Sequence, residues 1–168
     1  MDYDLYADVV IDQLIEIINA RDAQKLSDCF TKEKSEENIT KCNAGEILDF
    51  IEGEVLDYER VTDRIRKSNG GLFSNQYAIF FVRVYDIKTT QNEYRICYNY
   101  CYCNGDPDKE GMVSLGVSTL EDYDKGAVLY YGIPGLYIST CDNANDIEEI
   151  KTNYGEKFDN GELVPLEN

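Results

Sequence analysis

The residues with the greatest chemical potential lie in one stretch, 94–103, where tyrosines alternate with cysteines and other polar residues. Successive side chains of a β-strand point to opposite faces, so this alternation separates two sets. Tyrosines on one face could line a pocket or an interface, because each offers a large contact area at little loss of side-chain entropy. The alternative is that both faces are packed, one against helices and one against the C-terminal segment. The predicted tyrosine face is Tyr94, Ile96, Tyr98, Tyr100 and Tyr102.

The opposite face of this strand carries Cys97, Cys101 and Cys103, which raises the question of a metal site. Zinc sites use C-x2-C pairs, whereas the spacing here is C-x3-C-x-C. Same-face neighbours on a strand lie roughly 7 Å apart, so a tetrahedral site would need ligands from another strand. We therefore expect structural, reduced cysteines and neither a metal nor another cofactor. Oxidative pairing with the other three cysteines stays open.

An acidic loop follows the tyrosine strand and resembles the start of an EF-hand. Asp106, Asp108 and Glu110 occupy positions 1, 3 and 5, and Gly111 occupies position 6. Position 12 is Val117, where calcium binding requires a bidentate glutamate, and no helices are expected on either side. The loop is therefore interpreted as a strand connection. The acidic side chains of this loop are expected to be solvated, so Asp106 and Asp108 are candidates for contact with a partner.

The charge balance excludes several functions. The chain has 168 residues, with 33 acidic and 16 basic side chains, a net charge of −17 and no histidine. Without histidine there is no Ser-His-Asp or Cys-His nucleophile and no imidazole metal ligand. The negative charge repels phosphate backbones and anionic lipid surfaces, so neither nucleic acid nor a membrane surface is an expected partner.

The acidic surplus could serve solubility alone, or it could recognise a basic protein. Asp57 and Glu59 alternate on an expected strand in the manner of a solvated edge, and no carboxylate falls within an apolar strand face. We therefore expect no enzyme. A domain that neutralises a cationic partner, as an immunity protein or inhibitor does, is the leading hypothesis, since complementary charge accelerates encounter and makes it salt-sensitive.

Helices are expected in the first third of the chain. Apolar residues at helical spacing predict an amphipathic helix over 3–20. Asp22 is a predicted N-cap for a short second helix, and 31–41 is expected to be a loop. Asn43 with Glu46 forms a capping-box pattern for a third helix, with Gly53 as its C′ residue.

Strands are expected after Gly53, over 54–66, 76–88, 93–103 and 111–120. The second is apolar on both faces and should lie inside the sheet. Helices followed by long antiparallel strands predict an α+β domain over 1–140, with the helices on one face of a curved sheet. Residues 141–168 carry eight acidic and two basic side chains and form an acidic extension, with a short helix expected at 144–151.

The order of these elements resembles the nuclear transport factor 2-like, cystatin-like cone. Four segments further resemble a bacterial family of unknown function in that superfamily, whose members are usually small lipoproteins. Such a resemblance speaks for fold more than for function. The segments are 52–59 (EGEVLDYE), 93–96 (EYRI), 106–111 (DPDKEG) and 132–138 (GIPGLYI).

The resemblance adds alternatives to the residue-based hypotheses. It implies a small-molecule or peptide binder of the bacterial envelope, a homodimer through the open sheet face, or, third, an enzyme that pairs a tyrosine with a carboxyl group in its cavity. No apolar run is long enough for a transmembrane helix, and the acidic start, Met1–Asp4, is unlike a signal peptide. A cytoplasmic protein is therefore expected. The alternative is a lipid-anchored extracellular protein whose leader has been removed.

Overall fold

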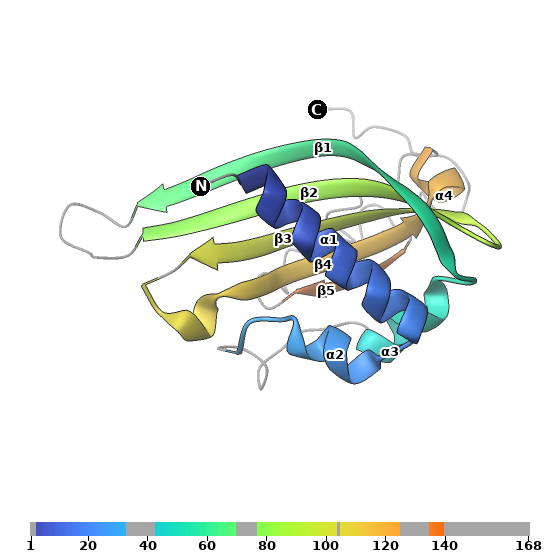
Figure 1. The fold of residues 1–168 in the computed structure, drawn as a ribbon, viewed down its shortest axis with the longest axis horizontal. Coiled ribbons are helices and arrows are strands. Elements are labelled where there is room, and N and C mark those ends of the chain that lie inside the picture. Colours follow the sequence, from blue (N-terminus) through green and yellow to red (C-terminus); the bar gives the residue numbers. More distant parts are fainter. Residues whose placement is uncertain (1–2, 33–42, 70–76, 104, 125–134, 140–168) are drawn as a thin grey trace, which may run out of the picture.

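Three helices precede the sheet along the chain and pack on one of its faces (Figure 1). The computed structural model describes residues 3–32, 43–69, 77–103, 105–124 and 135–139. The longest helix, α1, crosses the strands diagonally, while α2 and α3 lie beside its C-terminal end. The helix bounds are α1 Tyr3–Ala20, α2 Ala23–Asp28 and α3 Ala44–Phe50.

Both predicted helix caps are confirmed. The Asp22 side chain accepts a hydrogen bond from the backbone N–H of Lys25 at 3.0 Å. At α3, the Asn43 side chain accepts from the Glu46 N–H at 3.0 Å, and the Glu46 carboxylate accepts from the Asn43 N–H at 2.7 Å. These bonds satisfy donors that the first turn of a helix leaves free.

The end of α3 differs from the prediction, because its C-cap is Ile51 and Gly53 lies one residue beyond C′. Gly53 has a φ of 84°, and a Cβ there would lie 2.5 Å from the Thr90 Oγ1. Glycine is therefore required both by the backbone conformation and by the close approach of the β2–β3 turn.

Arg21 joins the ends of two helices. It has a φ of 55° directly after α1, and its guanidinium donates hydrogen bonds to the carbonyl oxygens of Leu48, Ile51 and Gly53. The bonds to Ile51 and Gly53 measure 2.6 and 2.7 Å. Since the last carbonyls of a helix lack partners within it, Arg21 caps α3 from outside.

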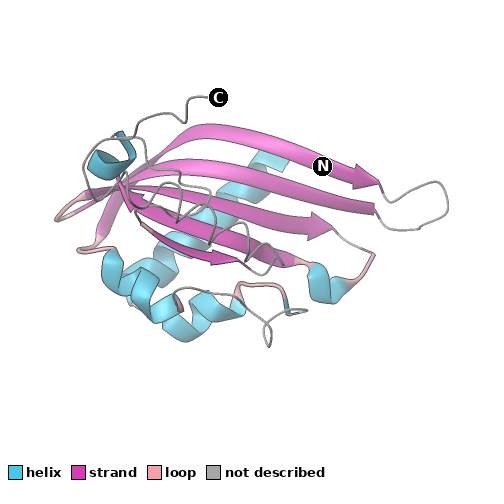
Figure 2. Ribbon diagram, turned by 180° about the vertical axis from the view of Figure 1, so that it is seen from behind, coloured by secondary structure: helices cyan, strands magenta, loops and turns pink. Residues whose placement is uncertain are grey.

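The sheet has five strands in the order β1-β2-β3-β4-β5, and all neighbours are antiparallel (Figure 2). The α+β class is thus confirmed, and the apolar strand β2 lies inside the sheet as predicted. Register shifts leave Leu56 and Val61 as extra residues in β1, and such bulges bend a strand. The strand bounds are β1 Val55–Asn69, β2 Tyr77–Thr89, β3 Glu93–Cys103, β4 Gly111–Thr119 and β5 Leu136–Ser139.

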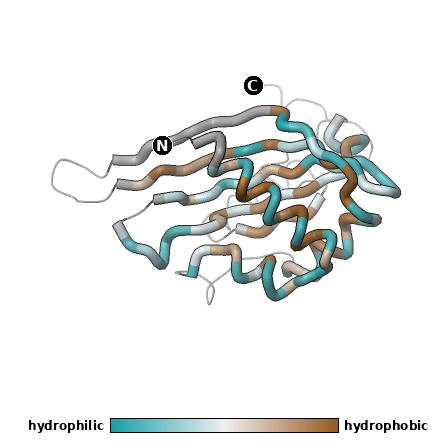
Figure 3. The backbone as a smooth tube through the Cα atoms, in the orientation of Figure 1, coloured by the Kyte–Doolittle hydropathy of each residue, from teal (hydrophilic) through white to brown (hydrophobic). Residues whose placement is uncertain are grey.

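The hydrophobic core is formed by buried residues of the helices and the sheet, and hydrophobic segments recur along α1 where it crosses the strands (Figure 3). The sheet contributes three fully buried tyrosines, Tyr85, Tyr94 and Tyr98. The rings of Tyr85 and Tyr98 are stacked with their centroids 6.0 Å apart. Core residues from the helices and the α3 C-cap include Ile11, Leu14, Ile18, Leu26, Ile47 and Ile51.

The short helix α4, Leu120–Asp124, and the strand β5 are additional to the predicted elements. A bidentate ion pair joins Arg95 to Asp86 across β3 and β2, with N···O distances of 2.6 and 2.7 Å. The guanidinium carbon of Arg95 lies 4.1 Å from the ring centroid of Tyr123 in α4. This cation–π contact fixes α4 against the two strands.

Several predictions fall outside the described residues. These are most of the loop at 31–41, the acidic extension 141–168 and the helix at 144–151. The domain boundary at residue 140 stays a prediction.

Candidate functional site

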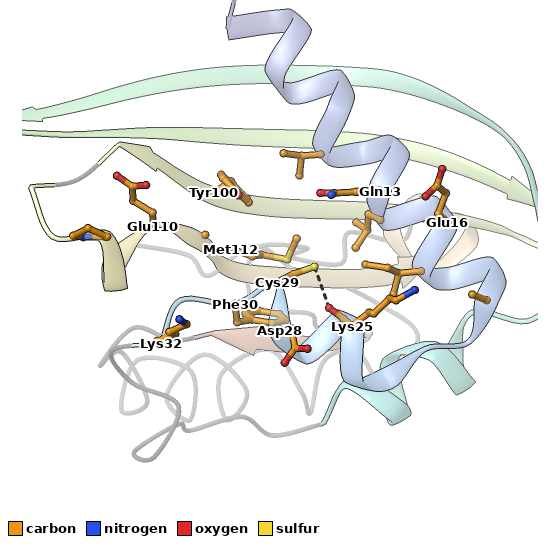
Figure 4. Close-up of a pocket in the computed structure, with 16 residues that line it drawn as sticks. Gln13, Glu16, Lys25, Asp28, Cys29, Phe30, Lys32, Tyr100, Glu110 and Met112 are labelled. Carbon is orange, nitrogen blue, oxygen red and sulfur yellow. Dashed lines mark hydrogen bonds between the residues drawn. The ribbon is translucent and has the colours of Figure 1, made fainter.

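A cavity opens where α1 and α2 meet the start of β4 (Figure 4). Its floor depends on residues Cys29–Thr31, which run beside Met112. The Met112 N–H donates to the Cys29 carbonyl at 2.8 Å, and the Thr31 N–H donates to the Met112 carbonyl at 3.0 Å. Gly111 has a φ of 129°, and a Cβ there would lie 3.0 Å from the Cys29 carbonyl oxygen. Glycine therefore permits this close backbone contact.

The cavity has a volume of about 680 Å³. Its wall from α1 includes Val10, Leu14 and Ile17, the inward residues of the amphipathic helix. The floor is completed by buried Met112, by Tyr100 and by other partly buried side chains. Phe30 is one of these, and Figure 4 shows it beneath Cys29 and Met112. The interior therefore offers apolar and aromatic contact to a ligand.

The rim of the cavity is polar and carries both charges. Lys25 forms an ion pair with Asp22, with an N···O distance of 3.6 Å, and Asp28 accepts a hydrogen bond from Gln24 at 2.9 Å. An apolar floor with a polar rim suits an amphipathic ligand. The polar rim side chains are Gln13, Glu16, Lys25, Asp28, Lys32 and Glu110.

The titratable groups inside the cavity hold their protons at neutral pH. Burial, with a smaller contribution from the Asp28 carboxylate, raises the pKa of the Cys29 thiol. Its Sγ donates a hydrogen bond to the Lys25 carbonyl at 3.2 Å (Figure 4). Burial also raises the pKa of Tyr100. Because a cysteine attacks as its thiolate, Cys29 is not activated as a nucleophile here.

The four predicted site tyrosines have different surroundings. Tyr94 and Tyr98 are about 1 and 0 % exposed. The Tyr94 hydroxyl accepts from the Glu52 N–H at 2.9 Å, and the Tyr98 hydroxyl donates to the Ala7 carbonyl at 3.3 Å. These two tyrosines are core residues with structural hydrogen bonds, so no ligand can reach them in the folded state.

The other two tyrosines lie nearer the surface. Tyr100 lines the cavity, and Tyr102 packs edge-on against Tyr6 of α1 with the ring centroids 4.4 Å apart. The tyrosine face is therefore packed along most of its length, and Tyr100 is the member of the predicted set that borders the cavity.

The predicted acidic residues of β1 border a second, shallow hollow of about 230 Å³. Asp57 and Glu59 are exposed there, beside Asp86 and Glu93. Lys88 is the one basic residue among those that line it. The hollow is a negatively charged surface feature on strands β1, β2 and β3.

Asp106 and Asp108 lie in the loop between β3 and β4 and line neither hollow, although Pro107 between them lines the cavity. The Asp106 side chain accepts from the Asp108 N–H at 3.1 Å and caps a 3-10 turn, Pro107–Lys109. This local role accounts for the EF-hand-like spacing. Within the described part of the chain, no cluster of three or more Cys, Asp or Glu residues is arranged to hold a metal ion.

The cysteine strand has buried thiols. Cys97 and Cys101 are buried on the face opposite the tyrosines and form no disulfide, and burial raises the pKa of Cys97 to about 11. Cys29 also forms no disulfide. Cys42 and Cys141, and the side chain of Cys103, lie outside the described part of the structure.

Sequence reasoning missed most of the cavity, including Cys29, Phe30 and Met112. The inward face of α1 was recognised, but only as core. The backbone hydrogen bonds between Cys29–Thr31 and Met112 join segments that are far apart in the sequence, so no local sequence pattern reveals them. Gly111 was the one available signal, because an isolated glycine at the start of a strand often marks a close backbone approach.

Comparison with known proteins identifies a family, but no similar curated protein and no similar solved structure. No helix among the described residues has the length and apolar character to span a membrane. Searches of curated proteins and of solved structures return no match. Residues 13–121 match the family described as domain of unknown function DUF5104, and the chain belongs to this family.

Proposed function

We propose that this chain is a non-enzymatic binding domain whose cavity takes a small molecule or short peptide with an apolar body. The observation that carries the proposal is the cavity between α1, α2 and β4. Its volume of about 680 Å³ falls in the range of roughly 300–1,000 Å³ that ligand sites usually have. An apolar floor would supply affinity, and the polar rim would orient the ligand.

The chemistry of the cavity favours binding over catalysis. The chain has no histidine to act as a general base at neutral pH. Cys29 and Tyr100 have raised pKa values and so keep their protons. The carboxylates that line the cavity, Glu16, Asp28 and Glu110, are exposed to solvent, whereas a catalytic acid usually lies in apolar surroundings.

We further propose that the fold is a variant of the nuclear transport factor 2-like cone. Helices before a bent antiparallel sheet, with a cavity between the two layers, support this assignment. Function does not follow from that assignment, since such folds host unrelated activities.

A blocking variant tests the binding proposal. Gln13 is exposed and lines the cavity, so Gln13→Trp should fill the entrance without disturbing the core. Val9→Trp is the matched control, because Val9 lies on the same helix, is 52 % exposed and does not line the cavity. The probe is N-phenyl-1-naphthylamine, whose fluorescence rises in apolar surroundings.

We expect the wild type and Val9→Trp to bind the probe equally, and Gln13→Trp to bind it at least about tenfold more weakly. Because the chain contains no tryptophan, Phe30→Trp provides a second readout from the cavity floor. The cavity would not be the site if Gln13→Trp left the affinity for the probe unchanged, or if the tryptophan emission of Phe30→Trp did not change when the probe was added.

A second candidate function is recognition of a basic protein, favoured by the acidic hollow that Asp57 and Glu59 border. The double variant Asp57→Asn/Glu59→Gln removes two charges without changing side-chain size. The immobilised domain should retain a basic protein from its source cells at low salt and release it at high salt. The double variant should retain less. Retention that depends neither on salt nor on these two carboxylates would contradict this role.

A further inference from the structure

Carboxylates outnumber lysines around the cavity. The charged side chains that line it are Glu16, Asp28 and Glu110 on the acidic side and Lys25 and Lys32 on the basic side. Lys25 also forms an ion pair with Asp22, a carboxylate outside the lining, with an N···O distance of 3.6 Å. With Asp22 included, the entrance has four carboxylates and two lysines, and its charge is negative.

The same imbalance holds for the whole segments that form the cavity. Residues 6–20 of α1 carry three acidic and no basic side chains, and the connection 106–110 before β4 carries three acidic and one basic. Segment 21–32, which contains α2, has a net charge of +1. The three segments together have a net charge of −4, within a chain of −17. This field attracts cations to the cavity and repels anions from it.

The rim carboxylates act on groups inside the cavity. Burial is the main cause of the raised pKa values of Cys29 and Tyr100, but Asp28 contributes to the first and Glu110 to the second. A carboxylate raises the pKa of a neighbour because it disfavours further negative charge there. Figure 4 shows Glu110 and Glu16 at opposite ends of the lining residues. The negative potential is therefore not confined to one corner of the cavity.

The aromatic floor is compatible with a positive charge. Tyr100 and Phe30 line the cavity and are partly buried. The face of an aromatic ring attracts a cation as well as offering contact to an apolar group. A cationic ligand would therefore gain from the floor and from the rim, whereas an anion would gain from the apolar contacts alone.

We propose that the ligand of the cavity is a small organic cation, with a primary amine or a quaternary ammonium group on an apolar body. The apolar body lies against Leu14, Ile17 and Met112, and the ammonium group lies near the rim carboxylates Glu16 and Asp28. This inference rests on the binding function proposed above and adds the charge of the ligand to it.

Three compounds with the same ring system and different charges test the preference. At neutral pH, 1-naphthylmethylamine is a cation, 1-naphthalenemethanol is neutral and 1-naphthaleneacetate is an anion. Each is titrated against the neutral probe N-phenyl-1-naphthylamine bound to the wild type. In about 0.02 M salt the amine should displace the probe at about three- to tenfold lower concentration than the alcohol, and the acetate should be weakest. In about 0.5 M salt, screening should reduce the advantage of the amine to about twofold or less.

Neutralising variants locate the source of the preference. Glu16→Gln and Asp28→Asn each remove one charge with little change in side-chain size, and both residues are exposed. Each should reduce the advantage of the amine over the alcohol about two- to threefold. The affinity for the alcohol should stay the same, which shows that the cavity is intact. Glu93→Gln is the matched control, because it changes the net charge equally but lines the second hollow. It should leave the advantage unchanged.

The outcomes separate this inference from the binding function. If the wild type binds the probe in the cavity but binds the alcohol or the acetate as tightly as the amine, the charge preference is wrong and the binding function stands. An advantage of the amine that neither Glu16→Gln nor Asp28→Asn reduces, or that Glu93→Gln reduces as much, would also overturn the preference. Both proposals fail if the probe does not bind, or if Gln13→Trp leaves its affinity unchanged.

Discussion

The two ends of strand β3 meet the helices in different ways. At its N-terminal end Tyr94 and Tyr98 are fully buried, and their hydroxyls are bonded to the backbone of the α3–β1 connection and of α1. At the C-terminal end Tyr100 borders the cavity and Tyr102 packs against Tyr6. The same side-chain type on the same face thus builds the core at one end and borders a cavity at the other.

The cause of the difference lies in the layer that covers the strand. Near Tyr94 the ends of α1 and α3 are tied together by Arg21, and Phe50 packs edge-on against the Tyr94 ring. Near Tyr100 the segment after α2 is held to the start of β4 by backbone hydrogen bonds, and space remains between it and α1. Strand alternation therefore assigns a residue to a face, and the opposite layer decides whether it is covered.

The largest expected effect comes from truncating one tyrosine at each end. Tyr98→Ala removes a buried ring and should lower the free energy of unfolding by about 3–5 kcal/mol. Tyr100→Ala removes a half-buried ring beside an existing cavity and should cost about 1–2 kcal/mol. Urea denaturation measures both. Equal losses would mean that the two ends are equally packed.

Substitution of Arg21 should destabilise the packing at the N-terminal end of β3 without changing the cavity. Arg21→Ala removes charged hydrogen bonds to three carbonyls and should lower the free energy of unfolding by about 2–3 kcal/mol. Arg21→Gly removes the same bonds but tolerates the φ of 55°, so its loss should be smaller by about 1 kcal/mol. Thermal and urea unfolding report these losses, and probe binding in the cavity should persist in both variants. Loss of probe binding would show that the two ends are coupled.

The smallest effect concerns Tyr58, an exposed tyrosine held by a hydrogen bond and not by burial. Its hydroxyl donates to the Asp12 carboxylate at 2.7 Å, which raises its pKa from 10.0 to about 12. Because the folded state holds the proton more tightly, the stabilisation is complete below pH 10 and is lost as pH rises towards 12. Between pH 9 and 11 the wild type should therefore lose more stability than Tyr58→Phe. Asp12→Asn should remove the difference, and equal pH profiles for wild type and Tyr58→Phe would contradict the assignment.

Local features of the fold were predictable from the sequence. The helix over 3–20 follows from its apolar spacing, and the caps at Asp22 and at Asn43 and Glu46 follow from side chains that bond within their own turn. The long strands follow from alternation and from β-branched and aromatic residues. Each of these signals lies within a few neighbouring residues, so a single sequence carries it.

Features that depend on distant segments were not predictable. The strand β5 has four residues, too few for a periodic signal, and it forms by pairing with β4. The cavity depends on the meeting of Cys29–Thr31 with Met112. Asp57 and Glu59 were correctly expected on the surface, but their position beside Asp86 and Glu93 around one hollow depends on the pairing of β1 with β2 and of β2 with β3.

Gly111 offers a way to sort the DUF5104 family. Any other residue at this position would combine an unfavourable backbone conformation with a close contact to the Cys29 carbonyl. The backbone contact between Cys29–Thr31 and Met112 would then have to rearrange. Family members that have glycine at the corresponding position can retain this backbone contact. In members with a branched residue there, the contact must be absent or differently arranged. A single column of a family alignment thus distinguishes members able to share this cavity from those that share only the fold.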